Sequence, residues 1–90
     1  MDRDEILNKA LTATKARGIE YGTPESNFGR IAQLWTAYNG NEYTVKDVGI
    51  MMILLKIARS SESPYNSDHY VDIAGYAAVT AEAVDVNGNI

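Results

Sequence analysis

Apolar residues recur with helical spacing along most of the chain, and turn-forming residues divide this pattern into four segments. The first segment runs from about residue 2 or 4 to Arg17, and Gly18 follows it. Its apolar stripe consists of Ile6, Leu7, Ala10, Leu11 and either Ala13 or Thr14. A spacing near 3.6 residues predicts an amphipathic helix, and a glycine directly after it is a common stop signal. We therefore expect a first helix that ends at Arg17.

A threonine and a proline open the second segment. Thr23 is suited to cap a helix, and Pro24 to occupy its first position, where the missing N–H has no cost. The segment continues to about residue 38, and its apolar stripe consists of Phe28, Ile31, Ala32, Trp35 and Tyr38. This spacing favours a packing role for Phe28 and Trp35 over a role as stacking surfaces for bases.

The third segment, from about residue 45 to 59, is apolar on nearly every side. Thr44 precedes it, and Asp47 completes a variant of the capping-box pattern. A helix that is apolar all round is typical of the centre of a bundle, so we expect this helix to be the most buried one. Ser67 is the expected cap of a fourth helix, which runs to about residue 84. The expected contact face of that helix consists of Ala74, Ala77, Ala78 and Ala81.

Together the segments predict an all-α fold. We expect one domain, a four-helix bundle over residues 1–84 with a central apolar third helix, and a frayed tail over residues 85–90. With 90 residues, such a domain buries only about 60–65% of the surface of the unfolded chain. We therefore expect self-association, in the form of a homodimer.

The overall charge limits the kinds of molecule that the protein is expected to bind. The formal net charge of −4 argues against broad attraction to nucleic acid or to an anionic membrane. The chain contains no cysteine, which excludes disulfides and thiolate metal sites. No basic leader or long apolar run is visible, so we expect a cytoplasmic protein.

Ionisable residues gather at the end of the third segment and the start of the fourth. They are Lys56, Arg59, Asp68, His69 and Asp72. A short connection favours antiparallel packing, which brings these two helix ends together. We predict that Asp72 faces Lys56 or Arg59. We also predict that Gly75 lies where the backbones of the third and fourth helices, or a bound phosphate, come closest.

Two interpretations of this cluster remain open. It is either a set of ion pairs that ties the helix ends, or a ligand site. In a site, Asp68 and Asp72 would bind Mg²⁺, with His69 as a further ligand, while Lys56 and Arg59 would neutralise phosphate oxygens. His69 is otherwise a solvated residue in a first helical turn.

A second polar group surrounds the start of the second helix. Tyr21, Asn27 and Arg30 lie there, and Tyr76 continues the polar stripe of the fourth helix. Helix N-termini accept anions, so these four residues are candidates for contact with a phosphorylated ligand. The alternative is a well-capped helix entry covered by a tyrosine.

Three stretches of the chain resemble a family of short phage and prophage proteins of unassigned function. They are YGTPESNFGRIAQLW, VGIMMILLKIAR and DHYVDIAGYAA, in this order, within about residues 17–80. The segment HYVDIAGYAA is also similar to the MazG-like all-α nucleoside triphosphate pyrophosphatases, with Asp72 in the position of a metal-binding aspartate. That resemblance implies a bundle, bound magnesium and assembly across a dimer. However, His69 stands where the family has an acid, and the third segment has no pair of acids.

We therefore predict a small phage-type helical protein that binds a nucleotide or another phosphorylated small molecule. Whether it is also an enzyme, using a metal ion to direct water at a phosphoanhydride, stays open because half of the acidic set is missing. The alternative is an acidic, non-catalytic phage protein that binds and inhibits a host protein, for example a defence component.

Overall fold

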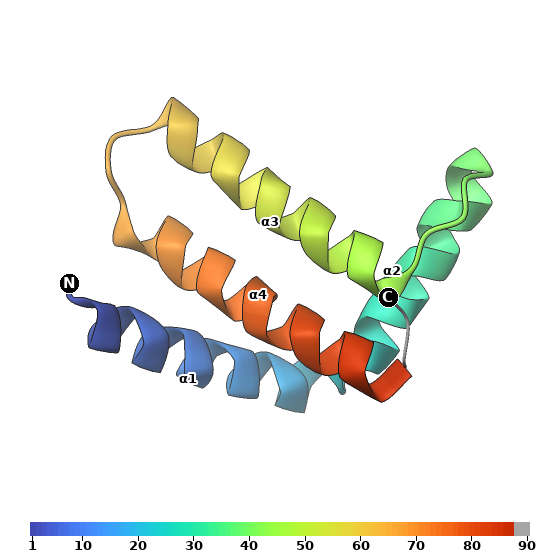
Figure 1. Cartoon of the computed structure of the whole chain (residues 1–90), viewed down its shortest axis with the longest axis horizontal. Coiled ribbons are helices and arrows are strands. Elements are labelled where there is room, and N and C mark those ends of the chain that lie inside the picture. The colour runs from blue at the N-terminus through green and yellow to red at the C-terminus, as the bar shows by residue number, and fades with distance from the viewer. Residues whose placement is uncertain (88–90) are drawn as a thin grey trace.

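The computed structural model describes residues 1–87, which form four α-helices and no strand. The helices are α1 (Arg3–Tyr21), α2 (Pro24–Asn39), α3 (Val45–Glu62) and α4 (Ser67–Asn87). In Figure 1, α4 lies between α1 and α3, while α2 crosses one end of this layer. The expected all-α bundle is confirmed. Within residues 1–87, no helix combines the length and the apolar character needed to cross a membrane.

Thr23 and Thr44 cap α2 and α3 as the sequence predicts, but the expected cap of α4 is wrong. Ser67 is the first residue of α4 itself, and the side-chain oxygen of Asn66 before it accepts the N–H of Asp68 at 3.0 Å. The Asp2 carboxylate accepts the N–H of Glu5 at 2.9 Å, and the Thr23 hydroxyl accepts that of Ser26 at 3.3 Å. Thr44 and Asp47 form a reciprocal pair, with N···O distances of 2.9 and 3.1 Å. These bonds satisfy N–H groups that have no partner inside a helix, which fixes where each helix begins.

Three helix ends lie beyond their expected positions. Gly18 does not end α1, which continues for another turn to Tyr21, and Gly22 ends it with a φ of 89°. α3 reaches Glu62 rather than residue 59, and α4 reaches Asn87. Residues 85–87 are therefore helical rather than frayed, and residues 88–90 lie outside the described residues. Helical glycine is tolerated at a modest cost, which is why Gly18 alone was a weak stop signal.

The centre of the packing is α4, because it contacts all three other helices. The main buried cluster consists of Phe28, Ala32, Val45, Val48 and Ala83. On α3 the buried side chains lie near its start, whereas Leu54 and Leu55 are 56% and 40% exposed. The expectation that α3 is the central, most buried helix is therefore wrong for the single chain.

Two other expected contact faces differ from those observed. On α1, Ala10 is buried, but Leu7 and Leu11 are exposed. On α4, the alanines of the expected face other than the half-buried Ala74 are exposed. The helix packs instead through Val71, Gly75, Thr80 and Ala83. The reason is that α4 has neighbours on several sides, so its buried residues do not form one narrow stripe.

Candidate functional site

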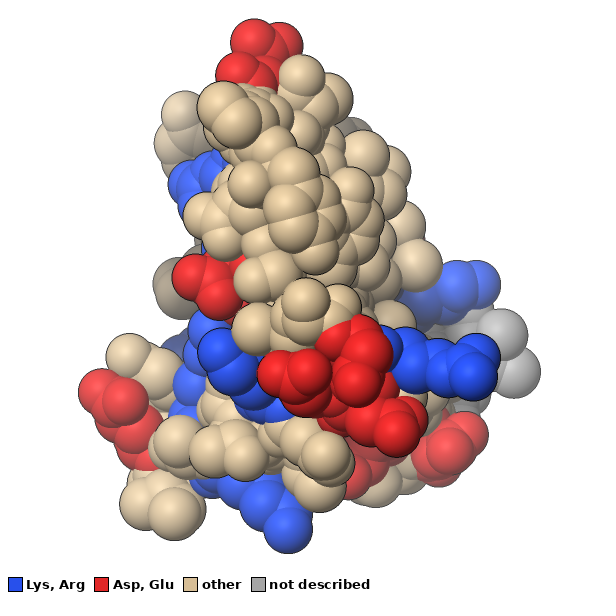
Figure 2. Space-filling model, turned by 90° about the vertical axis from the view of Figure 1, so that its left-hand side faces the viewer, with Lys and Arg blue, Asp and Glu red and all other residues tan. Residues whose placement is uncertain are grey.

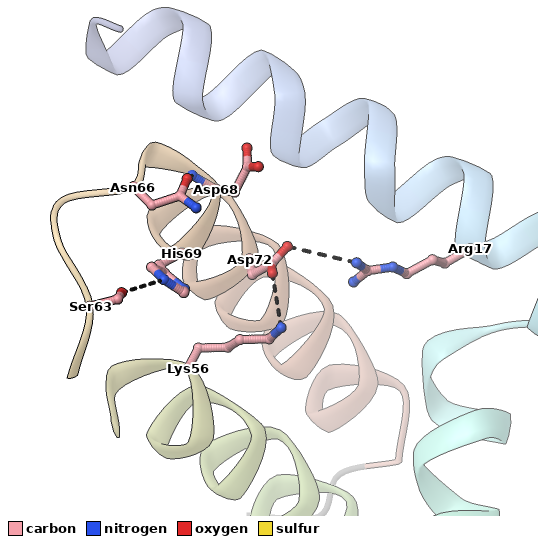
Figure 3. Close-up of polar contacts among 7 residues, drawn as sticks. All are labelled: Arg17, Lys56, Ser63, Asn66, Asp68, His69 and Asp72. Carbon is pink, nitrogen blue, oxygen red and sulfur yellow. Dashed lines mark hydrogen bonds and ion pairs between the residues drawn. The ribbon is translucent and has the colours of Figure 1, made fainter. Parts of the chain in front are cut away.

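Asp72 lies at the junction of three helices and forms ion pairs in two directions. Its Oδ2 atom lies 3.0 Å from Nζ of Lys56 on α3, and its Oδ1 atom lies 3.7 Å from Nη2 of Arg17 on α1 (Figure 3). The prediction that Asp72 faces Lys56 or Arg59 is confirmed, with Lys56 as the partner. Since two cations face one carboxylate, the group keeps an excess positive charge.

The three residues proposed for magnesium do not come together. Figure 3 shows the side chains of Asp68, His69 and Asp72 pointing in different directions. The Nε2 atom of His69 lies 3.2 Å from the Ser63 hydroxyl, and both oxygens of Asp72 face cations. Within residues 1–87, no three His, Asp or Glu side chains are grouped in a way that could hold a metal ion. Their spacing of one helical turn was compatible with a shared ion, but each side chain has a different neighbour.

Gly75 does not lie at the closest approach of α3 and α4, so that part of the prediction is wrong, while its expected proximity to a bound phosphate stays a prediction. A Cβ atom added there would lie 3.2 Å from Cγ2 of Thr14, so Gly75 faces α1 rather than α3. The close approach of α3 and α4 occurs instead at Gly49, where an added Cβ would overlap the side chain of Thr80. Thr80 is itself buried, and its hydroxyl donates to the carbonyl oxygen of Tyr76.

A cavity of about 340 Å³ opens beside Gly75, where the end of α1 meets the start of α2. α4 forms a third wall, and α3 contributes one side chain. The lining residues are Thr14, Arg17, Gly18, Tyr21, Gly22, Pro24, Asn27, Phe28, Ile31, Met52, Gly75, Tyr76 and Val79. The cavity exists partly because Gly18, Gly22 and Gly75 provide no side chains to occupy it.

Arg17 connects the cavity with the ion pairs. Its guanidinium carbon lies 5.8 Å from the centre of the Tyr76 ring, a distance at which cation and ring attract each other. Phe28 also lies near Tyr76, with ring centres 6.5 Å apart. The Arg17 side chain is about half exposed, so it can contact both Asp72 and a molecule in the cavity.

The residues proposed to contact phosphate fall into three groups. Tyr21, Asn27 and Tyr76 line the cavity together. Lys56 does not line the cavity, but it pairs with Asp72, which also pairs with Arg17 of the cavity wall. Arg30 and Arg59 are exposed residues that do not line the cavity. The structure thus brings Tyr21 and Asn27 together with Tyr76 of α4, whereas Arg30 and Arg59 lie outside the cavity.

Sequence reasoning missed Arg17, the cation that lines the cavity. It was assigned to the end of the first helix, where a basic residue needs no further explanation because it complements the helix dipole. Its position directly before Gly18 and five residues before Gly22 was the available signal. The contact with α4 depends on the crossing of two helices that are distant in sequence.

Comparison with known proteins places the chain in a family. Residues 5–84 match the family described as Domain of unknown function (DUF6378), and the chain therefore belongs to that family. Its relatives include the Gene 55 protein of Mycobacterium phage L5, which is 56% identical over 77 residues, and that of Mycobacterium phage D29, which is 44% identical over 61 residues. The expected resemblance to phage proteins of unassigned function is confirmed.

The matched regions cover much of this chain but less of the relatives. They span 84% and 68% of this chain, and 46% and 40% of the phage L5 and D29 proteins. The chain thus spans less than half the length of the curated relatives that it matches. No solved structure matches it. The resemblance to MazG-like pyrophosphatases stays a prediction.

Proposed function

We propose that this phage-type protein binds a small anionic ligand with a planar ring, of the mononucleotide class, in the cavity between α1, α2 and α4. The observation that carries the proposal is the meeting of a guanidinium and several aromatic rings at a cavity of about 340 Å³. Small-molecule sites commonly have volumes of about 300–1,000 Å³. The lower end of that range favours a mononucleotide over a larger cofactor.

Each polar residue of the cavity has a role that matches such a ligand. The Arg17 guanidinium can donate two parallel hydrogen bonds to a phosphate, and Lys56 reduces the competition from Asp72 by pairing with it at 3.0 Å. The rings of Tyr21 and Tyr76 offer apolar faces to a base. The Asn27 amide both donates and accepts, which suits the edge of a base.

The proposal does not include hydrolysis assisted by magnesium. Magnesium prefers carboxylate and water oxygens in an octahedral arrangement. The Asp72 carboxylate, which pairs with Arg17 of the cavity wall, also pairs with Lys56, and no metal-binding group of three acids or histidines occurs within residues 1–87. We therefore expect binding to be independent of magnesium.

The alternative, an acidic protein that inhibits a host protein, draws on the net charge of −4 and the small size of the chain. These two properties do not define a binding surface. The cavity, by contrast, has a stated location, size and charge, so it carries the proposal.

Binding can be tested by thermal unfolding, and Kd measured by titration calorimetry, with nucleoside monophosphates, each with EDTA and with Mg²⁺. We expect the melting temperature to rise with at least one of them, because a ligand that binds only the folded state stabilises it. Arg17→Gln should raise Kd about tenfold or more, since it removes a charge-assisted hydrogen bond. Lys15→Gln removes an exposed cation of α1 that does not line the cavity, and should leave Kd unchanged.

A second pair of variants separates the cavity from general electrostatics. Gly18→Leu places a side chain beside the cavity where an added Cβ has no neighbour within 4 Å, so the protein should fold but lose binding. Gly29→Leu, at a helical glycine that is equally free of neighbours and does not line the cavity, should still bind. The absence of any response of the wild-type protein to monophosphates at millimolar concentration would contradict the proposal.

A further inference from the structure

The wall of the cavity between α1, α2 and α4 contains one charged side chain. Of the residues within 1–87 that line it, only Arg17 is acidic or basic. Phe28, Ile31 and Val79 make part of the remaining wall apolar, and the polar groups beside them, such as the Asn27 amide, are uncharged. A ligand in the cavity therefore meets a single cation directly.

Arg17 belongs to a cluster of three charged side chains, of which the other two lie outside the cavity wall. The Oδ1 atom of Asp72 lies 3.7 Å from Nη2 of Arg17, and its Oδ2 atom lies 3.0 Å from Nζ of Lys56. The side chains of Asp72 and Lys56 are only 24% and 16% exposed, so solvent screens this pair weakly. Two cations and one carboxylate give the cluster a net charge of +1.

The surface of the protein adds no broad positive field to this cluster. The formal net charge of the chain is −4. Figure 2 shows the end of the molecule that carries the loop between α3 and α4, where acidic side chains lie among the basic ones. A ligand with several negative charges would therefore be repelled by the chain as a whole, and only the cluster would attract it.

We infer, on the basis of the proposed function of this cavity, that its ligand is a phosphodiester with one negative charge and an attached base, rather than a monophosphate dianion or a triphosphate. The two non-bridging oxygens of a phosphodiester match the two parallel donors of the Arg17 guanidinium. Its single charge is equal and opposite to the charge of the cluster. A second negative charge would enter a partly apolar cavity without a cation to pair with, which weakens binding.

A matched pair of ligands tests this charge preference. Titration calorimetry at about pH 7.5, where a phosphate monoester is mostly a dianion, compares each nucleoside 5′-monophosphate with its methyl ester. The methyl ester has the same base and sugar but only one negative charge. We expect its Kd to be about threefold to tenfold lower. The 3′,5′-cyclic mononucleotide with the same base is also singly charged, and comparison with the methyl ester shows whether the diester is open or cyclic.

A change of pH tests the same preference on the wild-type protein. The second pKa of a phosphate monoester is about 6, so most of the monophosphate carries one charge at about pH 5.5. Its Kd should therefore fall about threefold to tenfold between about pH 7.5 and pH 5.5, whereas that of the methyl ester should not change. The methyl ester controls for titration of the protein itself, because Arg17, Asp72 and Lys56 face both ligands alike and His69 lies outside the cavity wall.

Two variants with equal changes in total charge test the role of the cluster. Asp72→Asn raises the charge of the cluster from +1 to +2, so the monophosphate should bind at least as tightly as its methyl ester. Asp68→Asn changes the charge of the chain by the same amount at an exposed position outside the cluster, and should keep the wild-type preference. Circular dichroism checks that both variants remain helical. If Asp72→Asn does not fold, the pH comparison on the wild type decides.

The possible results separate this inference from the proposed function. Binding of none of these ligands would overturn both. Binding of the monophosphate and the methyl ester with equal Kd at about pH 7.5, or a monophosphate Kd that does not fall at about pH 5.5, would overturn the inference alone. The same holds if Asp72→Asn keeps the wild-type preference, or if Asp68→Asn loses it as well.

Discussion

Beside α4, Gly49 on α3 and Gly18 near the end of α1 have opposite surroundings, while Gly75 of α4 itself lies close to Thr14 of α1. At the contact with α3, Gly49 lies against Thr80, whose Cβ would be only 2.7 Å from an added Cβ. At the contact with α1, Gly18 has no neighbouring atom within 4 Å of an added Cβ and lines the cavity. A helical glycine therefore indicates a close approach of backbones in one region and open space in the other.

Asp72 connects these two regions. It pairs with Lys56 across the contact with α3 and with Arg17 across the contact with α1. The carboxylate is about three-quarters buried, whereas Arg17 is about half exposed. The tighter pair thus belongs to the tightly packed region, and the longer pair to the region with the cavity.

The largest loss of stability is expected at Gly49, where α3 and α4 approach each other most closely. Gly49→Ala should lower the free energy of unfolding by about 1–3 kcal/mol, because the new methyl group overlaps Thr80 and the helices must separate. Urea denaturation measures this change. Gly29→Ala is the control, since its Cβ has no neighbour within 4 Å, and it should stabilise the protein by about 0.5–1 kcal/mol. A Gly49→Ala variant with the same free energy of unfolding as the wild type would contradict the proposed difference in packing between the two regions.

A smaller loss of stability is expected at Asp72, which connects the two regions through its ion pairs. Asp72→Asn should lower the free energy of unfolding by about 1–2 kcal/mol, because Lys56, with a side chain only 16% exposed, would lose its ion partner. Asp68→Asn, at an exposed position for which no ion pair occurs within residues 1–87, should stay within about 0.5 kcal/mol of the wild type. Equal unfolding free energies for the two variants would show that the ion pairs do not stabilise the fold.

The smallest effect has the opposite sign. Gly18→Ala should raise the free energy of unfolding by about 0.5–1 kcal/mol, since alanine is the better helix former and the new methyl group has no neighbour within 4 Å. Thermal unfolding followed by circular dichroism measures the gain. Destabilisation by Gly18→Ala would mean that the region around α1 is as tightly packed as the region around α3.

Local signals predicted the helices well because they act within a few residues. The Thr44–Asp47 capping pair and the proline at the start of α2 both occur as expected. The C-terminal ends of the helices were predicted less accurately. Gly18 is compatible with a continuing helix, and α1 ends only at Gly22, which has a positive φ. A sequence pattern does not distinguish these two glycines, because tertiary contacts decide which one ends the helix.

The candidate site was predicted only in part, for a related reason. The pairing of Asp72 with Lys56 followed from a short connection between antiparallel helices. The contribution of Arg17 depends on α1 packing beside α4, and no local pattern specifies that neighbour. Likewise, an all-round apolar α3 is compatible with a central helix and also with a helix that leaves one apolar face exposed. Only the arrangement of all four helices distinguishes these two cases.

The attachment of α1 has a consequence for the dynamics of the cavity. This helix packs mainly on α4, whereas α2 and α3 also pack on each other, so α1 is held by the fewest elements. Local opening favours such segments, and α1 supplies Arg17, Gly18 and Tyr21 to the cavity wall. Detachment of α1 would dismantle the cavity while leaving the cluster around Val48 intact. Binding of a molecule in the cavity would therefore be coupled to docking of α1, because such a molecule would contact α1 and the other helices at the same time.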